Sequence, residues 1–176
     1  MAGSIGYLFL HALSIVLIAR TAGAESVGIY LLAQAVGMPL SMFCGLRYHD
    51  INATEQNISR ISGHFRNILM VAVPATMVAL GLWSLFTDGH TRIVGVSLIL
   101  ANVLQGFAQA PQGRMIRLRR FRAAATFEIS RGVLSLASFS VGLLLFGSLF
   151  VATMLLLVGW VILLAIEYYA ASRMSR

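Results

Sequence analysis

The sequence contains no lysine, a single cysteine and little charge of either sign. Charged residues make up 11% of the 176 residues, whereas soluble domains carry about 25%. With 59% hydrophobic residues, this composition excludes an ordinary soluble domain and favours a membrane protein. The basic residues are all arginines and give a net charge of +7. A basic balance is also typical of nucleic-acid-binding proteins, but apolar runs separate these arginines, so we expect no nucleic-acid partner.

The sequence also lacks the short motifs of common enzymes. It has no dinucleotide-binding glycine fingerprint, phosphate-binding loop, HExxH motif or nucleophile elbow. Cys44 stands alone in an apolar run and predicts neither a disulfide nor a metal site. A metal-dependent membrane transferase would need clustered Asp or His, and only His49 and Asp50 are adjacent. We therefore expect a protein that is not an enzyme and that holds no cofactor and no metal.

Six apolar stretches are present, each near the roughly 20 residues that a helix needs to cross the hydrocarbon core. They predict an all-α, polytopic membrane bundle of six transmembrane helices, which forms a single membrane domain over residues 1–176. The predicted spans are residues 1–19, 27–46, 67–86, 93–110, 123–146 and 149–166.

The arginines are distributed unevenly between the connections of these spans. Arginine near the ends of membrane helices marks the cytoplasmic side. The first and third connections hold only Arg20 and Arg92. The second and fourth connections and the tail hold the others, apart from Arg131: Arg47, Arg60, Arg66, Arg114, Arg117, Arg119, Arg120, Arg122, Arg173 and Arg176. This asymmetry predicts that both termini lie in the cytoplasm.

Polar residues recur at the three- and four-residue spacing that places side chains on one helix face. Such stripes predict a polar cavity shared by four spans; the alternative is that they only hydrogen-bond between helices. Small residues at strict four-residue spacing, Ala33, Gly37, Ser41 and Gly45, predict a close helix-packing edge. In the first span the stripe contains Ser4, Tyr7, His11 and Ser14, and in the second it contains Tyr30, Gln34, Gly37, Ser41 and Tyr48. In the fourth it contains Asn102, Gln105, Gln109 and Gln112, and in the fifth it contains Glu128, Arg131, Ser135, Ser138 and Gly142.

Arg131 is predicted to lie within the membrane. The stretch 132–146 that follows it spans only about 22 Å at 1.5 Å per residue, less than the ~30 Å hydrocarbon core. Glu128 precedes Arg131 by three residues on the same helix face, so the two side chains are expected to pair. The pair either only neutralises Arg131, or it holds Arg131 toward a substrate in the cavity.

Two stretches, residues 19–50 and 112–139, resemble the amino-terminal half of bacterial oligosaccharide flippases. These form the polysaccharide-exporter branch of the multidrug/oligosaccharidyl-lipid/polysaccharide exporter superfamily. The resemblance covers nearly the whole chain but only one lobe of a two-lobe, flippase-like fold. The matching features are Ala19-Arg20 before Gly23, Gly28, Tyr30, Pro39 and Gly45-Leu46-Arg47, then Gly113-Arg114, Phe121, Glu128-Ile129 and Arg131.

The resemblance implies a protein of the bacterial inner membrane that moves a polyprenyl-pyrophosphate-linked oligosaccharide to the outer leaflet, for cell-surface polysaccharide synthesis such as that of lipopolysaccharide. Expected partners are this lipid-linked oligosaccharide, membrane lipids and a second lobe, which could be another copy of the chain. Arginine binds pyrophosphate through its planar fork of donors, and neutral amides can bind sugar hydroxyls. The expected substrate-binding residues are Arg20, Arg47, Arg131, Glu128, Gln34, Asn102, Gln105, Gln109 and His11.

Two other classes remain open at this point. One is half of an ion-coupled multidrug-type exporter, which would favour carboxylates inside the bundle; only Glu128 and Glu167 qualify. The other is a non-catalytic membrane subunit or a truncated product. His11 is expected to be a hydrogen-bonded packing residue more often than a proton carrier.

Overall fold

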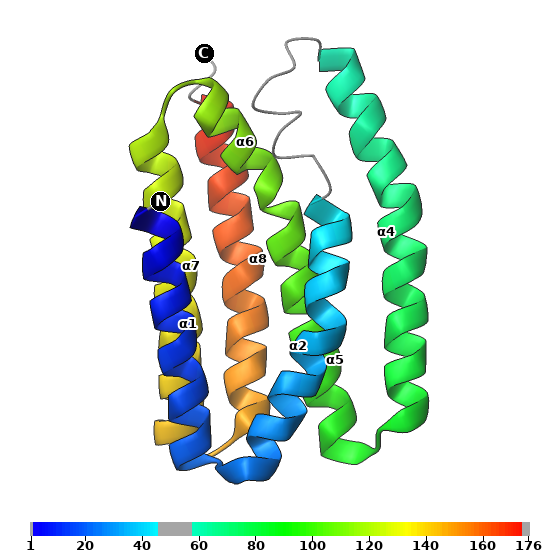
Figure 1. Ribbon diagram of the computed structural model, residues 1–176, viewed down its shortest axis with the longest axis vertical. Coiled ribbons are helices and arrows are strands. Elements are labelled where there is room, and N and C mark those ends of the chain that lie inside the picture. Colours follow the sequence, from blue (N-terminus) through cyan, green and yellow to red (C-terminus); the bar gives the residue numbers. More distant parts are fainter. Residues whose placement is uncertain (1, 46–57, 174–176) are drawn as a thin grey trace.

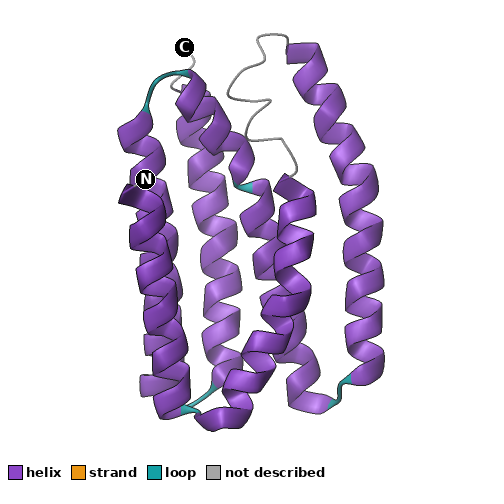
Figure 2. Ribbon diagram, viewed as in Figure 1, coloured by secondary structure: helices purple, strands orange, loops and turns teal. Residues whose placement is uncertain are grey.

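The computed structural model describes residues 2–45 and 58–173, with side chains described for residues 5–45 and 66–173. These residues form helices joined by short turns, without a strand in the described ranges (Figure 2). The helices are α1 (Ala2–Thr21), α2 (Gly23–Gly45), α4 (Ile58–Phe86), α5 (Gly89–Phe107), α6 (Gln109–Arg117), α7 (Phe121–Ser140), the π-helical turn η1 (Val141–Leu145) and α8 (Leu149–Arg173).

The predicted all-α membrane bundle is confirmed. Each predicted span corresponds to a helix, with α6 extending the fourth and η1 ending the fifth. Among the described residues, five segments are long and apolar enough to cross a membrane, and residues 5–21 of α1 form a shorter apolar helix. Large apolar side chains cover the outer faces, for example Phe9, Met42, Met77 and Leu144. Such a surface suits lipid rather than water.

Two pairs of helices pack most extensively, α2 along α5 and α1 along α7, and α8 packs against both α5 and α7. α4 lies at the edge of the bundle, against α2 and α5 (Figure 1). The turns after α1, α4 and η1 all lie at the lower end in Figure 1, and α1 begins and α8 ends in its upper half. The α6–α7 turn, rich in arginine, also lies at the upper end.

The predicted edge of small residues on α2 is the surface that contacts α5. A Cβ atom on Gly37 would lie 2.8 Å from Asn102 Nδ2, and one on Gly106 would lie 2.5 Å from the carbonyl oxygen of Ser41. Gly45 is equally close to Gln109. At Gly106 the backbones of α2 and α5 therefore approach so closely that only glycine fits, whereas at Gly37 and Gly45 a Cβ atom would meet a side chain.

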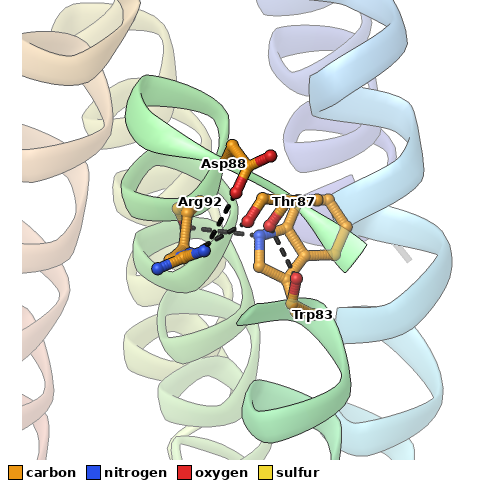
Figure 3. A network of polar contacts seen from close by, with 4 residues as sticks. All are labelled: Trp83, Thr87, Asp88 and Arg92. Atoms are coloured by element: carbon orange, nitrogen blue, oxygen red, sulfur yellow. Dashed lines mark hydrogen bonds and ion pairs between the residues drawn. The ribbon is translucent and has the colours of Figure 1, made fainter. Parts of the chain in front are cut away.

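A polar cluster closes the α4–α5 turn (Figure 3). Trp83 Nε1 donates a hydrogen bond of 3.2 Å to the carbonyl of Arg92. Arg92 in turn donates to the carbonyl of Thr87 at 2.9 Å and to Asp88 Oδ1 at 3.2 Å. Thr87 Oγ1 donates to the carbonyl of Trp83. These bonds satisfy backbone carbonyls near the end of α4 and hold α4 and α5 together.

Candidate functional site

Two polar cavities lie next to each other between the helices. The larger cavity has a volume of about 400 Å³, and the smaller one about 20 Å³. Tyr7 and Gln105 line both, so the two share a wall. The larger cavity is lined by Tyr7, Leu8, Gln105, Gln109, Gln112, Glu128 and Arg131. The smaller is lined by Tyr7, His11, Tyr30, Gln34, Leu98, Ala101, Asn102, Gln105, Ser135, Leu156 and Trp160.

Four predicted polar stripes thus meet in the interior, on α1, α2, α5 with α6, and α7. The described side chains of α4, residues 66–86, line neither cavity. The lining is dominated by neutral hydrogen-bonding groups, namely amides, phenols and an imidazole. Unpaired polar groups in contact with lipid cost several kcal/mol each, which is why the helices turn these faces toward one another.

Hydrogen bonds connect the walls of the smaller cavity. Gln105 Nε2 donates to Tyr7 Oη at 2.9 Å, and the Tyr7 ring stacks on His11 with 5.8 Å between ring centroids. Tyr30 Oη lies 3.3 Å from His11 Nε2 and accepts a hydrogen bond of 3.1 Å from Gln34 Nε2. His11 is therefore held in the cavity wall by aromatic and polar neighbours.

Gln34 Oε1 is a buried acceptor that has no hydrogen-bond partner among the described residues. A cavity needs roughly 10–15 Å³ that the centre of a water molecule can occupy in order to hold one water molecule. The smaller cavity therefore has room for one water molecule, and Gln34 supplies an acceptor for it.

Arg131 is the charged centre of the site and is 5% exposed. Its Nε donates to Glu167 Oε1 at 2.9 Å, and its Nη2 donates to Glu167 Oε2. Nη2 also donates to the carbonyl oxygen of Ala108 at 3.1 Å, and the guanidinium lies 5.7 Å from the centre of the Trp160 ring. Nη1 is the guanidinium nitrogen without a hydrogen bond to the described residues, and it belongs to a side chain that lines the larger cavity.

The carbonyl that receives Arg131 lies at a break between two helices. Helix α5 ends at Phe107 and α6 begins at Gln109, with Ala108 between them. Pro111 lacks an amide hydrogen and crowds the carbonyl four residues before it, at Phe107. Pro111 therefore does not end the helical segment, because it occupies the first turn of α6, where no amide donor is needed.

The expected partner of Arg131 was Glu128, and the structure instead shows an ion pair between Arg131 and Glu167 of α8. Glu167 is 1% exposed, so its charge would be strongly destabilising without a cation beside it. Glu128 is less buried and lines the larger cavity together with Arg131. Arg131 is thus paired with the more deeply buried of the two carboxylates.

Of the nine predicted site residues, seven line the cavities. Four of these are at the smaller cavity: His11, Gln34, Asn102 and Gln105. Gln105, Gln109, Glu128 and Arg131 are at the larger one. Arg20 is exposed near the end of α1, at the opposite end of the bundle, and lines neither cavity. Arg47 lies outside the described residues, as do His49 and Asp50.

The structure adds site residues that the predicted list left out. Tyr7 and Gln112 were members of the predicted stripes. Glu167 lies one residue beyond the predicted sixth span and is the only charged residue between 132 and 172. A single carboxylate next to an apolar span is the sequence feature that could have identified it as a site residue.

The described residues contain no group of three or more His, Cys, Asp or Glu side chains that could hold a metal ion. Comparisons of the chain with protein-family models, curated proteins and solved structures find no match.

Proposed function

We propose that this chain forms one lobe of a membrane transporter for a polyprenyl-pyrophosphate-linked oligosaccharide, and that the larger cavity binds the head group. The observation that supports this most is the lining of that cavity. Inside an apolar bundle, three glutamines and a tyrosine line a space of about 400 Å³. Ligand-binding sites typically measure about 300–1,000 Å³. A sugar offers many hydroxyls, and amides supply both donors and acceptors for them.

Arg131 contributes to this site in a restricted way. Glu167 takes both of its stronger hydrogen bonds and neutralises its charge. One nitrogen, Nη1, remains for a phosphate oxygen, so the side chain acts as a single oriented donor rather than as a two-pronged clamp. The neutral amides then provide most of the binding to the sugar.

A direct test is binding of a short-chain polyprenyl-pyrophosphate-linked oligosaccharide to the chain purified in detergent. Gln105→Leu and Gln109→Leu remove amides from the cavity and should each weaken binding about tenfold, since each loses hydrogen bonds worth about 1.4 kcal/mol or more. Asn67→Leu is the matched control, because Asn67 is exposed on α4, which lines neither cavity. Equal affinities for all four proteins would contradict the proposal.

The same chain as a monomer should bind this lipid without translocating it. Alternating access requires a second body that moves against the first, and this bundle is a single body. Liposomes that contain the monomer and a fluorescent lipid-linked oligosaccharide should show no transfer between leaflets. Transfer by a demonstrated monomer would contradict the assignment of the chain as one lobe.

A second candidate is half of an ion-coupled exporter of organic cations. The lining of the larger cavity favours it, because Glu128 belongs to that lining and a carboxylate is the group that an organic cation would need there. Glu128→Gln separates the two candidates. It should abolish binding of an organic cation, whereas binding of the anionic lipid-linked sugar should persist or become tighter.

A further inference from the structure

An apolar groove runs along the outer side of α7 and α8. It has a volume of about 580 Å³ and is lined almost entirely by apolar and small side chains. These are Thr126, Ile129, Ser130, Val133, Leu134, Ala137, Gly159, Ile162, Leu163 and Ile166. The groove is distinct from the polar cavities, since the two sets of lining residues have no member in common.

The groove and the larger cavity occupy opposite faces of α7. Glu128, Arg131 and Ser135 share the inward face, as their three- and four-residue spacing requires. Ser130, Val133 and Ala137 follow the same spacing but are displaced by about half a turn, so they face outward. A molecule in the groove would therefore be in contact with the surrounding membrane and not with the polar cavities.

One end of the groove is cationic. On α7, Arg122 lies one turn before Thr126 and continues the same stripe; on α8, Arg173 lies two turns after Ile166. Both arginines are exposed. They lie at the same end of the bundle, because Ala124 and Ala171 pack together in one small apolar cluster with Met115 (Figure 1).

An aromatic ring lies at the same end. The guanidinium of Arg173 is 5.0 Å from the centre of the Tyr169 ring, and Tyr169 is exposed. Tyrosine is favoured where the hydrocarbon meets the head groups of a membrane. Tyr169 thus marks the level at which the apolar groove gives way to the charged end.

The length of the groove matches one leaflet. From Thr126 to Ala137 the helix rises about 16 Å at 1.5 Å per residue, close to half of the ~30 Å hydrocarbon thickness. Arg122 lies about 6 Å beyond Thr126 on the same measure. An acyl chain in the groove would place a phosphate at the height of the two arginines.

We propose that this groove binds an anionic phospholipid, with an acyl chain between α7 and α8 and the phosphate at Arg122 and Arg173. The apolar lining selects a lipid tail, and the paired arginines select a negative head group through charge-assisted hydrogen bonds. A packed transmembrane helix would also cover apolar surface, but it would give no role to two exposed arginines at one end. The site is independent of the proposed transport function, because it lies on the opposite face of α7.

The test is titration of the detergent-purified chain with phosphatidylglycerol and with phosphatidylcholine of the same acyl chains, with bound lipid counted by native mass spectrometry. Phosphatidylglycerol should bind at least tenfold more tightly. The double variant Arg122→Gln/Arg173→Gln should lose that preference and leave phosphatidylcholine binding unchanged. The matched control is Arg119→Gln/Arg120→Gln, which removes the same charge from the adjacent turn and should retain the preference.

A second pair of variants tests the groove itself. Ala137→Phe fills the groove and should weaken the binding of both lipids, whereas Ala12→Phe, at an exposed position on α1, should weaken neither. The proposal is overturned if Arg122→Gln/Arg173→Gln keeps the preference, if the control pair loses it equally, or if Ala137→Phe binds lipid normally. It is also overturned if glycerol phosphate alone competes fully, or if Ala137→Phe instead converts a dimer to a monomer, which would identify the groove as a protein interface.

Discussion

Arg131 and Glu167 form a buried ion pair, and the other buried side chains that the structure describes are apolar or neutral. Removal of two charges from water is costly, and their mutual attraction compensates for this only when the hydrogen bonding is good. Here three hydrogen bonds hold the guanidinium, one of them to the backbone at the break between α5 and α6. The pair ties together α7, α8 and the α5–α6 break, so its loss should affect the whole bundle.

We expect Glu167→Leu to destabilise the protein by about 3–5 kcal/mol, because Arg131 would remain buried without its counter-ion. Arg131→Met should cost a similar amount, since it leaves Glu167 unpaired. The double variant Arg131→Met/Glu167→Leu should recover most of the loss, because apolar side chains of similar size then fill the space. Thermal stability of the purified protein in detergent, followed by the fraction that stays monodisperse, gives the measurement.

The double variant also distinguishes a structural pair from a functional one. If the pair only neutralises Arg131, the stable double variant should bind the lipid-linked sugar as the native chain does. If Nη1 contacts the pyrophosphate, binding should stay weak although stability has returned. A double variant as unstable as the single ones would mean that the pair contributes net stability, contrary to the expectation.

Counting residues to the next turn, which is local information, predicted only how deep Arg131 lies in the membrane. The structure adds that its side chain is buried between helices and that Glu167 is the carboxylate that pairs with it. This pairing depends on how α8 rotates against α7, which brings together residues 36 positions apart. Spacing along one helix pointed to Glu128, whereas burial on the facing helix favours Glu167.

The contact between α2 and α5 depends on glycines. A Cβ atom on Gly106 would meet the backbone of Ser41, which cannot rotate away as a side chain can. Gly81, on α4, has no atom within 4 Å of the corresponding position. The two glycines therefore provide a test of packing and of helix propensity within the same bundle.

We expect Gly106→Ala to destabilise the protein by about 1–3 kcal/mol, because the two helices must move apart. Gly81→Ala should instead stabilise it by up to about 1 kcal/mol, since alanine has the higher helix propensity and nothing obstructs it. The thermal stability assay described above measures both. Equal effects of the two substitutions would show that the α2–α5 contact is looser than the structure indicates.

Helix positions and the packing edge of α2 were accessible from the sequence because apolar length and four-residue spacing are direct signals. The break at Ala108 and the π-helical turn at Val141–Leu145 were not. A proline can end a helix or begin one, and its local sequence does not decide between them. The choice here is linked to tertiary structure, since the Ala108 carbonyl accepts a hydrogen bond from Arg131.

The bundle as a whole has two unlike ends. The lower end in Figure 1 has three tight turns, after α1, α4 and η1, and carries Arg20 and Arg92. The upper end carries the arginine-rich turn between α6 and α7 and the end of α8. The larger cavity is lined by Tyr7 and Leu8 of α1, by Glu128 and Arg131 of α7 and by glutamines on both sides of the α5–α6 junction, so it lies toward the arginine-rich end.

This asymmetry leads to a prediction about orientation in the cell. Arginines near helix ends are retained on the cytoplasmic side, so the upper end should face the cytoplasm and the larger cavity should open toward it. Gly89 begins α5 at one end of the bundle and Arg173 ends α8 at the other. Reporter fusions at these two positions should therefore give opposite results, with a periplasmic signal at Gly89 and a cytoplasmic one at Arg173.

Arginine replacement tests the cause of this orientation. The orientation should weaken or invert when glutamine replaces the five arginines at the upper end, which are Arg114, Arg117, Arg119, Arg120 and Arg122. It should become stronger when glutamine replaces Arg20 and Arg92 at the lower end. A periplasmic signal at Arg173 in the native chain, with none at Gly89, would reverse the topology and place the cavity toward the periplasm.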